Sequence, residues 1–264
     1  MQALCSELRD EYEELAGLVA ALTPDQWRQT TAFYGWTPFD EISHLLYFDE
    51  RGLLAATDAE GFAQDAKAIV AAMAAGKEIS ALARDCYGKL DGATLTRRWK
   101  DCSGRLIDRL AALDPKARLP WYGPPMSARS FATARMMEVW AHGQDIYDLL
   151  GRRRTPTARL KHIAHIGVGA FGWTFVNRKL PVPAVTPHVA LTAPDGSLWT
   201  WGEASATDCV NGSAEDFCLV VTQRRNVVDT DLHCVGSAAG WLAIAQCFAG
   251  PPANPPAPGT RRTA

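Results

Sequence analysis

Residues 136–145 read Met136-Met137-Glu138-Val139-Trp140-Ala141-His142-Gly143-Gln144-Asp145. The apolar residues indicate a buried helix, and Glu138 and His142 stand four positions apart within it. Four residues are just over one helical turn, so both side chains leave the same face and can converge on one point. A carboxylate and an imidazole are costly to bury unless something satisfies them, and a metal ion commonly does. The stretch therefore predicts a bundle helix that carries two metal ligands.

The composition is that of an ordinary soluble globular protein. The 264 residues are 47% hydrophobic and 21% charged, enough to bury a sizeable core, and we expect two domains. A net charge of −2 and a pI near 6.3 give no electrostatic reason to expect nucleic acid or an anionic membrane. No apolar run approaches the roughly 18 residues that span a bilayer, and the N-terminus lacks a signal-peptide pattern.

The seven cysteines are scattered, odd in number and never spaced as Cys-x-x-Cys. This pattern argues against a disulfide framework or a zinc ribbon and favours free thiols in a reducing cytoplasm. We therefore predict a cytoplasmic protein in which each cysteine is a small buried apolar residue.

Helical spacing of apolar residues dominates the first 180 residues. Thr37-Pro38-Phe39-Asp40-Glu41 is a strong helix start, with a Thr cap and Pro at the first helical position. Ser127 or Ser130 caps the helix that carries Glu138, and Gly151 ends it. The expected helices span about 2–22, 37–56, 59–87, 92–113, 127–150 and 156–178.

The pattern changes after a linker marked by Pro181, Pro183 and Pro187. Residues 188–201 predict two strands around an Asp-Gly turn. Residues 214–225 and 237–249 predict helices, with a short strand near 230–235 between them. The expected organisation is mainly α: a helical domain over 1–180, a small α+β domain over 188–250, and a disordered Pro-rich tail over 251–264.

His44 supplies a third candidate ligand. It lies well inside the second bundle helix, where its apolar neighbours indicate that it points to the core. Bundles build metal sites from inward-facing side chains on neighbouring helices. Two imidazoles and one carboxylate leave a coordination position open, as in catalytic sites. The competing interpretations are a hydrogen-bonded core histidine and a surface Glu-His pair.

Two other metal-site types do not fit the sequence. The His-Glu-x-x-His motif of zinc proteases is absent. A ferritin-like di-iron site needs two Glu-x-x-His motifs, and only Glu41-Ile-Ser-His44 matches, because Glu138 and His142 have the wrong spacing. The single-ion interpretation therefore remains.

These residues also carry a family resemblance. His44 in a capped helix, followed by Glu-Val-Trp-x-His-x-x-Asp over 138–145, resembles the mycothiol-dependent maleylpyruvate isomerase-like branch of the DinB-like superfamily. Segments 35–44 and 120–127 are similar to an actinobacterial subgroup of metal-binding proteins. Region 212–250 resembles the second domain of that subgroup, which is described as wyosine-base-formation-like or sterol-carrier-like.

The resemblance implies a DinB-like up-down four-helix bundle that holds one divalent ion, usually zinc, through His44, Glu138 and His142. It implies that Asp145, one turn past His142, orients that ligand or acts on a bound water or thiol. Arg224 or Arg225 falls where related proteins place an arginine that reaches from the second domain. The sequence does not decide between them, and we select Arg224; the alternative is a helix end that favours cations.

Zinc with an open position deprotonates a coordinated thiol. The expected function is therefore a metal-dependent enzyme, an isomerase or transferase, that activates a low-molecular-weight thiol such as mycothiol toward a small electrophile. A hydrolase using metal-bound water and a non-catalytic metal- or ligand-binding protein stay open, as does a homodimer. An RNA-modification role is disfavoured by the acidic balance. Three aromatic residues directly precede the helices that carry the candidate ligands. They either line a substrate cleft at one end of the bundle or anchor loops there: Trp36, Trp121 and Tyr122.

Overall fold

The structure is a computed structural model that describes residues 1–261. It divides into two compact units, the first over Met1–Ile146 and the second beginning at Tyr147. Most of the chain is helical, and the strands form two small sheets. The predicted class, a mainly α protein with an N-terminal helical bundle followed by a small α+β domain, is confirmed. Among the described residues, no helix is long and apolar enough to cross a membrane.

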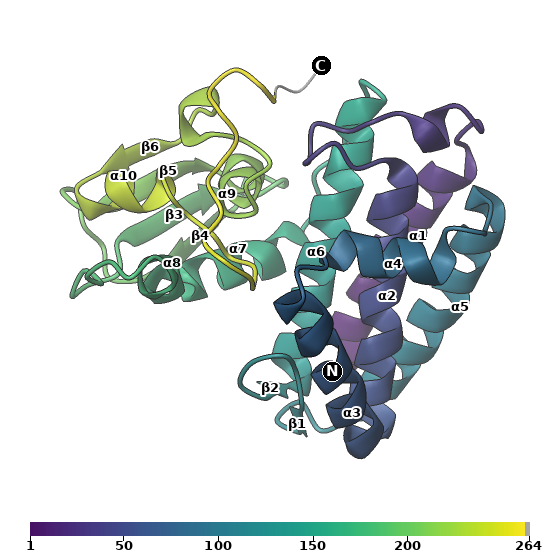
Figure 1. Ribbon diagram of the computed structural model, residues 1–264. Helices are drawn as coiled ribbons and strands as arrows, with labels where there is room; N and C mark the ends of the chain where they lie inside the picture. Colours follow the sequence, from purple (N-terminus) through teal and green to yellow (C-terminus); the bar gives the residue numbers. More distant parts are fainter. Residues whose placement is uncertain (262–264) are drawn as a thin grey trace. The chain divides into compact units, whose positions relative to one another are not determined.

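The first unit is built on four long helices (Figure 1). They are α1 (Gln2–Ala20), α2 (Pro38–Thr57), α5 (Gly92–Ala111) and α6 (Ala128–Leu149). Their inward faces bury a continuous apolar core. Shorter elements connect them: η1 (Gln26–Arg28), α3 (Ala59–Ala74), α4 (Ile79–Tyr87) and the paired strands β1 (Arg118–Leu119) and β2 (Met126–Ser127).

Helices α2 and α5 run in the same direction. Arg98 pairs with Glu50, and further along both helices Arg109 Nε donates to the Ala56 carbonyl at 2.9 Å. The connection through α3 and α4 allows α5 to run parallel to α2, because α4 crosses α2 and returns the chain to the end where α2 begins (Figure 1). Helix direction therefore does not alternate strictly along the chain, because α2 and α5 are consecutive long helices of the bundle and parallel.

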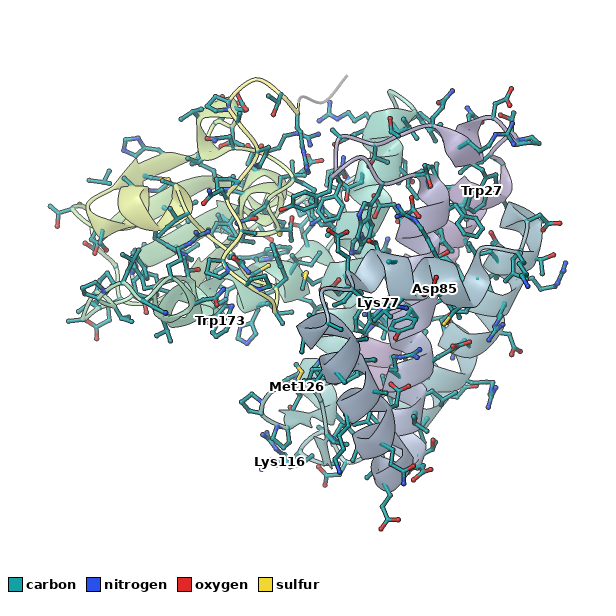
Figure 2. All side chains as sticks on the ribbon, in the orientation of Figure 1. Trp27, Lys77, Asp85, Lys116, Met126 and Trp173 are labelled. Atoms are coloured by element: carbon teal, nitrogen blue, oxygen red, sulfur yellow. The ribbon has the colours of Figure 1, made fainter. Side chains whose placement is uncertain are left out.

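Two predicted long helices are each broken. Residues 59–87 form α3 and α4 because Gly76 adopts φ +84°, a left-handed conformation that ends a helix. Lys77 Nζ donates to Asp85 at 3.2 Å just after the break (Figure 2). Residues 156–178 likewise form two helices, α7 (Leu160–Gly169) and α8 (Phe171–Asn177).

The predicted start of α2 is confirmed in detail. The Thr37 side chain accepts from the Asp40 amide at 3.3 Å, and the Asp40 carboxylate accepts from the Thr37 amide at 2.9 Å. This reciprocal pair satisfies two of the amides that have no partner within the helix. Arg84 on α4 holds the same carboxylate at 2.6 Å. The cap therefore fixes where α2 begins, two turns before His44.

Replacing Thr37 with alanine should destabilise the first unit by about 1 kcal/mol, because the Asp40 amide loses its acceptor. Urea denaturation followed by circular dichroism measures the change. Thr94→Ala is the matched control: Thr94 lies in the first turn of α5 and its hydroxyl accepts from Arg97, whereas its backbone amide, which the substitution keeps, donates to the Asp91 cap. Equal stability of the two variants would show that the cap contributes nothing.

A charged network lies inside the bundle. Asp49 on α2 is 0% exposed and Arg135 on α6 is 3% exposed, and the two are 2.9 Å apart. Tyr12 Oη and Trp99 Nε1 also donate to the Asp49 carboxylate, at 2.7 and 2.9 Å. Burial alone would lower the pKa of Arg135, but the charge of Asp49 raises it, so the guanidinium stays charged. The network joins all four long helices.

The second unit contains a four-stranded sheet of order β4-β3-β5-β6. The hairpin predicted over 188–201 is confirmed, with β3 (His188–Thr192) antiparallel to β4 (Leu198–Trp201) and Gly196 at φ +82° in the turn. Strand β5 (Cys209–Ser213) pairs parallel to β3 and antiparallel to β6 (His233–Val235). The sequence analysis did not predict β5, although it lies in the middle of the sheet.

Helices of the second unit are shorter than predicted. The structure places α9 at Ala214–Val221, η2 at Val227–Asp229 and α10 at Ser237–Leu242. Helix α7 packs on α9, where Gly167 lies so close to Phe217 that an added Cβ would be 2.8 Å from its ring. Residues 147–180, assigned from sequence to the helical domain, therefore belong to the second unit.

The Pro-rich tail differs from the disordered segment expected. Residues 251–261 form no helix or strand, yet side chains of the second unit hold them. Gln223 Nε2 donates to the Ala253 carbonyl at 2.7 Å, and the Ala253 amide donates to Gln246 at 2.9 Å. Proline prevents regular structure but leaves carbonyls free to accept. Residues 262–264 lie outside the described part of the chain.

All seven cysteines are free thiols, as predicted. Five of them are buried, whereas Cys86 is exposed and Cys234 is partly exposed. The expectation of a buried apolar role is therefore wrong for Cys86, which lies on the solvent side of α4. Burial raises the pKa of Cys102 to about 12, so this thiol stays protonated at neutral pH.

Candidate metal centre

The structure brings the three predicted ligands together. Glu138 Oε2 lies 3.6 Å from His44 Nε2 and 3.3 Å from His142 Nε2. The three ligand atoms all lie within 4.8 Å of one another, and the two imidazole centroids are 4.5 Å apart. His44 comes from α2, and Glu138 and His142 come from successive turns of α6. The arrangement follows from the inward faces of two neighbouring bundle helices.

These separations fit one tetrahedral ion. Two ligand atoms each about 2.1 Å from a tetrahedral zinc lie about 3.4 Å apart. The two measured separations of 3.3 and 3.6 Å bracket that value. The donor set of two imidazole nitrogens and one carboxylate oxygen is one that zinc accepts, and it leaves a fourth position for another ligand. The residues present therefore fit the ion that the sequence predicts.

Glu138 is held in its anionic form. Burial by itself would raise the pKa of this carboxyl, but its hydrogen bonds and electrostatic interactions with His142 and His44 hold the pKa well below its usual range. A carboxylate that is ionised at neutral pH needs no deprotonation before it binds a cation.

Glu41 is a neighbour of the site that the sequence analysis missed. Its carboxylate is 0% exposed, and Glu41 Oε2 lies 2.6 Å from His142 Nδ1. The hydroxyl of Thr31, itself buried, donates to Glu41 Oε1 at 3.3 Å. The sequence presented Glu41 as an acid in the first turn of a helix, or as half of a di-iron motif. No local sequence pattern indicates that Glu41 lies against His142, which is 101 positions away in the chain.

Aromatic rings surround the imidazoles. The Trp36 ring is stacked on His142 at 5.8 Å with an interplanar angle of 8°, and it also meets His44 at 5.3 Å. Phe33 meets the His142 ring edge-on at 5.4 Å, and Phe48 meets His44 at 4.8 Å. These rings limit the access of water to the ligands and leave an apolar surface beside them.

Trp121 and Tyr122 lie one layer further out. Both pack on Phe62, and Trp121 also meets Phe131 edge-on at 4.9 Å. They touch Phe48 rather than either imidazole. The loop-anchor interpretation therefore describes these two residues, whereas Trp36 lies against the candidate ligands.

Asp145 falls into a second group rather than with His44 and Glu138. It is buried, and its carboxylate lies within 4.8 Å of ligand atoms of Glu41 and His142. The sequence placed Asp145 one turn beyond His142, and the structure thus adds a second carboxylate beside that imidazole. Its catalytic role stays a prediction.

The two candidate arginines belong to the second unit, just after α9. Arg225 forms a bidentate ion pair with Asp148, at 2.7 and 2.8 Å. Arg224 is 3% exposed, and its Nη1 donates to the Thr222 carbonyl at 2.8 Å. Both side chains are buried, which contradicts the alternative interpretation of an exposed helix end that favours cations. The role predicted for Arg224 concerns the first unit and stays a prediction.

Comparison with known proteins gives the family of this chain. The model of the mycothiol maleylpyruvate isomerase N-terminal domain matches residues 8–147, which include the three candidate ligands. Two uncharacterized proteins of Mycobacterium tuberculosis, from strains CDC 1551 and H37Rv, are each 44% identical over 248 residues, covering 94% of this chain and 95% of theirs.

Solved structures share the fold over nearly the whole chain. A mutant of the mycothiol-dependent maleylpyruvate isomerase has a TM-score of 0.56 at 13% identity, covering 88% of this chain and 92% of that one. A second structure of that isomerase has a TM-score of 0.53 at 14% identity, covering 84% and 89%. The chain therefore belongs to the family defined by the mycothiol maleylpyruvate isomerase N-terminal domain.

Proposed function

We propose that the protein is a metal-dependent enzyme that activates a low-molecular-weight thiol, mycothiol, for addition to a small electrophile. The observation that carries this proposal is the convergence of His44, Glu138 and His142 at separations that fit one zinc ion. Membership of a family named for a mycothiol-dependent isomerase supports the thiol as cosubstrate. The site would hold zinc through these three residues, and zinc there would keep the thiol as thiolate.

The surrounding residues prepare the site for such chemistry. Trp36, Phe33 and Phe48 exclude water from one side of the ligands, which strengthens electrostatic interactions there. Asp145 provides a buried carboxylate next to His142, and we assign it to orienting that imidazole. Arg224 is our choice for the residue that binds the anionic part of the substrate, because a guanidinium offers paired donors that match a carboxylate.

The proposed reaction needs no oxidant or reductant. The thiolate sulfur forms a bond to one carbon of an activated cis double bond, and the π electrons move to the conjugated carbonyl. Rotation about the resulting single bond, followed by return of those electrons and cleavage of the C–S bond, gives the trans isomer and regenerates the thiolate. If the adduct takes up a proton instead, the thiol stays attached and the product is a conjugate.

Incubation of the zinc-loaded protein with mycothiol and maleylpyruvate or another activated alkene should give a trans isomer or a conjugate. In NMR spectra, the coupling constant of the alkene protons identifies the trans isomer, and loss of the alkene signals identifies the conjugate. His44→Ala should abolish turnover because one ligand is lost. Arg224→Lys should lower kcat or raise KM while zinc content stays unchanged. Asp145→Asn should lower zinc affinity as well as turnover, because the His142 ligand is then less well oriented.

Three controls separate this proposal from its alternatives. Turnover that does not depend on mycothiol, measured on ester and amide substrates, would identify a hydrolase instead. Zinc binding with no turnover of any electrophile would identify a binding protein. Full activity of the His44→Ala variant would show that the three-residue site does not carry the chemistry.

A further inference from the structure

The two candidate histidine ligands are held in different ways. The Nδ1 atom of His142 faces the buried Glu41 carboxylate at 2.6 Å. The Nδ1 atom of His44 is also buried, but it has no hydrogen-bond partner among residues 1–261. The His44 ring packs against Trp36, Phe48 and His142, and its Nε2 atom lies 3.6 Å from Glu138 Oε2. Through Nδ1, a carboxylate therefore orients only one of the two imidazoles.

We propose that Glu41 is a positioning residue that holds His142 with Nδ1–H toward α2 and Nε2 toward the ion. This inference rests on the metal centre of the proposed function and adds a residue to it. A carboxylate that accepts from one ring nitrogen fixes the tautomer, so the other nitrogen keeps its lone pair for a metal. The observed geometry has this form, since His142 Nε2 lies toward Glu138 and Nδ1 toward Glu41.

The Glu41 carboxylate is itself held in place. Thr31 Oγ1 donates to Glu41 Oε1 and also accepts from the Phe33 amide at 3.1 Å. The Thr31 amide in turn donates to the Trp36 carbonyl at 2.7 Å, which closes the loop over residues 31–36. The same loop presses Phe33 and Trp36 against the His142 ring. Ring contacts and the carboxylate thus fix the imidazole from three sides.

The loop needs an unusual backbone to do this. Tyr34 has φ +49° and Gly35 has φ +70°, so two successive residues are left-handed. This conformation is strained for tyrosine and ordinary for glycine. The turn brings Phe33 and Trp36 to the same side, with the Trp36 amide donating to the Phe33 carbonyl at 2.9 Å. The loop over residues 31–36 and the Glu41 carboxylate therefore position the His142 ring together.

The test compares zinc affinity in wild type, Glu41→Gln and Glu41→Leu, measured by competition with a chromophoric chelator. Loss of an outer carboxylate partner costs about 10- to 100-fold in metal affinity. We expect a loss in that range for Glu41→Gln and a larger one for Glu41→Leu, which removes every acceptor. Glu50→Gln is the matched control, because Glu50 lies on the same helix and pairs with Arg98 and Tyr87 instead.

A second readout distinguishes positioning from general damage to the fold. In zinc-loaded protein with ¹⁵N-labelled histidine, the Nδ1–H proton of His142 should resonate far downfield because of its short bond to a carboxylate. It should move upfield in Glu41→Gln, while the His44 signals stay in place. Unchanged affinity and an unchanged His142 proton in the Glu41 variants overturn the inference, with the metal centre left intact. A wild-type protein that binds no zinc overturns the proposed function itself.

Discussion

Replacing Asp49 with alanine is expected to lower the free energy of unfolding by about 3–5 kcal/mol. The substitution leaves the Arg135 guanidinium buried without its counter-ion, 2.9 Å from where the carboxylate stood. It also removes the acceptor of Tyr12 Oη and Trp99 Nε1, both inside the core. Unsatisfied buried donors add to the cost, because water cannot replace the lost partner.

Urea denaturation of the Asp49→Ala variant measures this loss. Glu13→Ala is the matched control, since it also removes a carboxylate that pairs with a cation on another bundle helix. Glu13 and Lys100 are 2.9 Å apart but largely exposed, and breaking such a pair costs less than about 1 kcal/mol. Similar stability of the two variants would mean that water reaches Arg135 once the carboxylate is gone.

The main features of the fold could be predicted because they depend on local chemistry. The start of α2 was predicted from a Thr-Pro sequence whose capping bonds are formed within four residues. The hairpin over 188–201 was predicted because Asp195-Gly196 favours the turn between two alternating strands. Each of these signals lies within one short stretch, so tertiary contacts did not have to be known.

Features that depend on tertiary contacts could not be predicted in this way. Strand β5 contains Asn211, Gly212 and Ser213, residues of low strand propensity, and forms because β3 and β6 flank it. The break at Gly76 lies in an Ala-rich stretch whose helical periodicity continues on both sides. Over residues 251–261, the proline content correctly excluded helix and strand, but it gave no sign of the hydrogen bonds that Ala253 forms with Gln223 and Gln246.

The candidate site shows the same division. Glu138 and His142 could be paired from sequence because a four-residue spacing in a helix fixes their common face. His44 needed the further assumption that its helix packs beside theirs, and the structure brings the three together. Glu41 could not be found, because its partner is set by the antiparallel packing of α2 and α6 and by no local spacing.

Replacing Glu138 with glutamine should lower zinc affinity by at least 100-fold. Glutamine keeps the size of the side chain but removes the only negative charge among the three ligands, so the ion is bound by neutral groups alone. The loss should exceed the roughly 10- to 100-fold cost of altering an outer partner such as Glu41, because Glu138 is a ligand itself.

Metal analysis after dialysis and chelator competition both measure this change, and circular dichroism establishes that the variant is folded. Glu50→Gln again serves as the control, because it makes the same substitution in the same bundle outside the ligand group. Wild-type affinity in Glu138→Gln would mean that the ion is held elsewhere, for instance by Glu41, His142 and Asp145, the second group of close ligand atoms. We expect zinc affinity to be highest in wild type, lower in Glu41→Gln and lowest in Glu138→Gln. This order requires that Glu138 binds the ion directly and that Glu41 acts through His142.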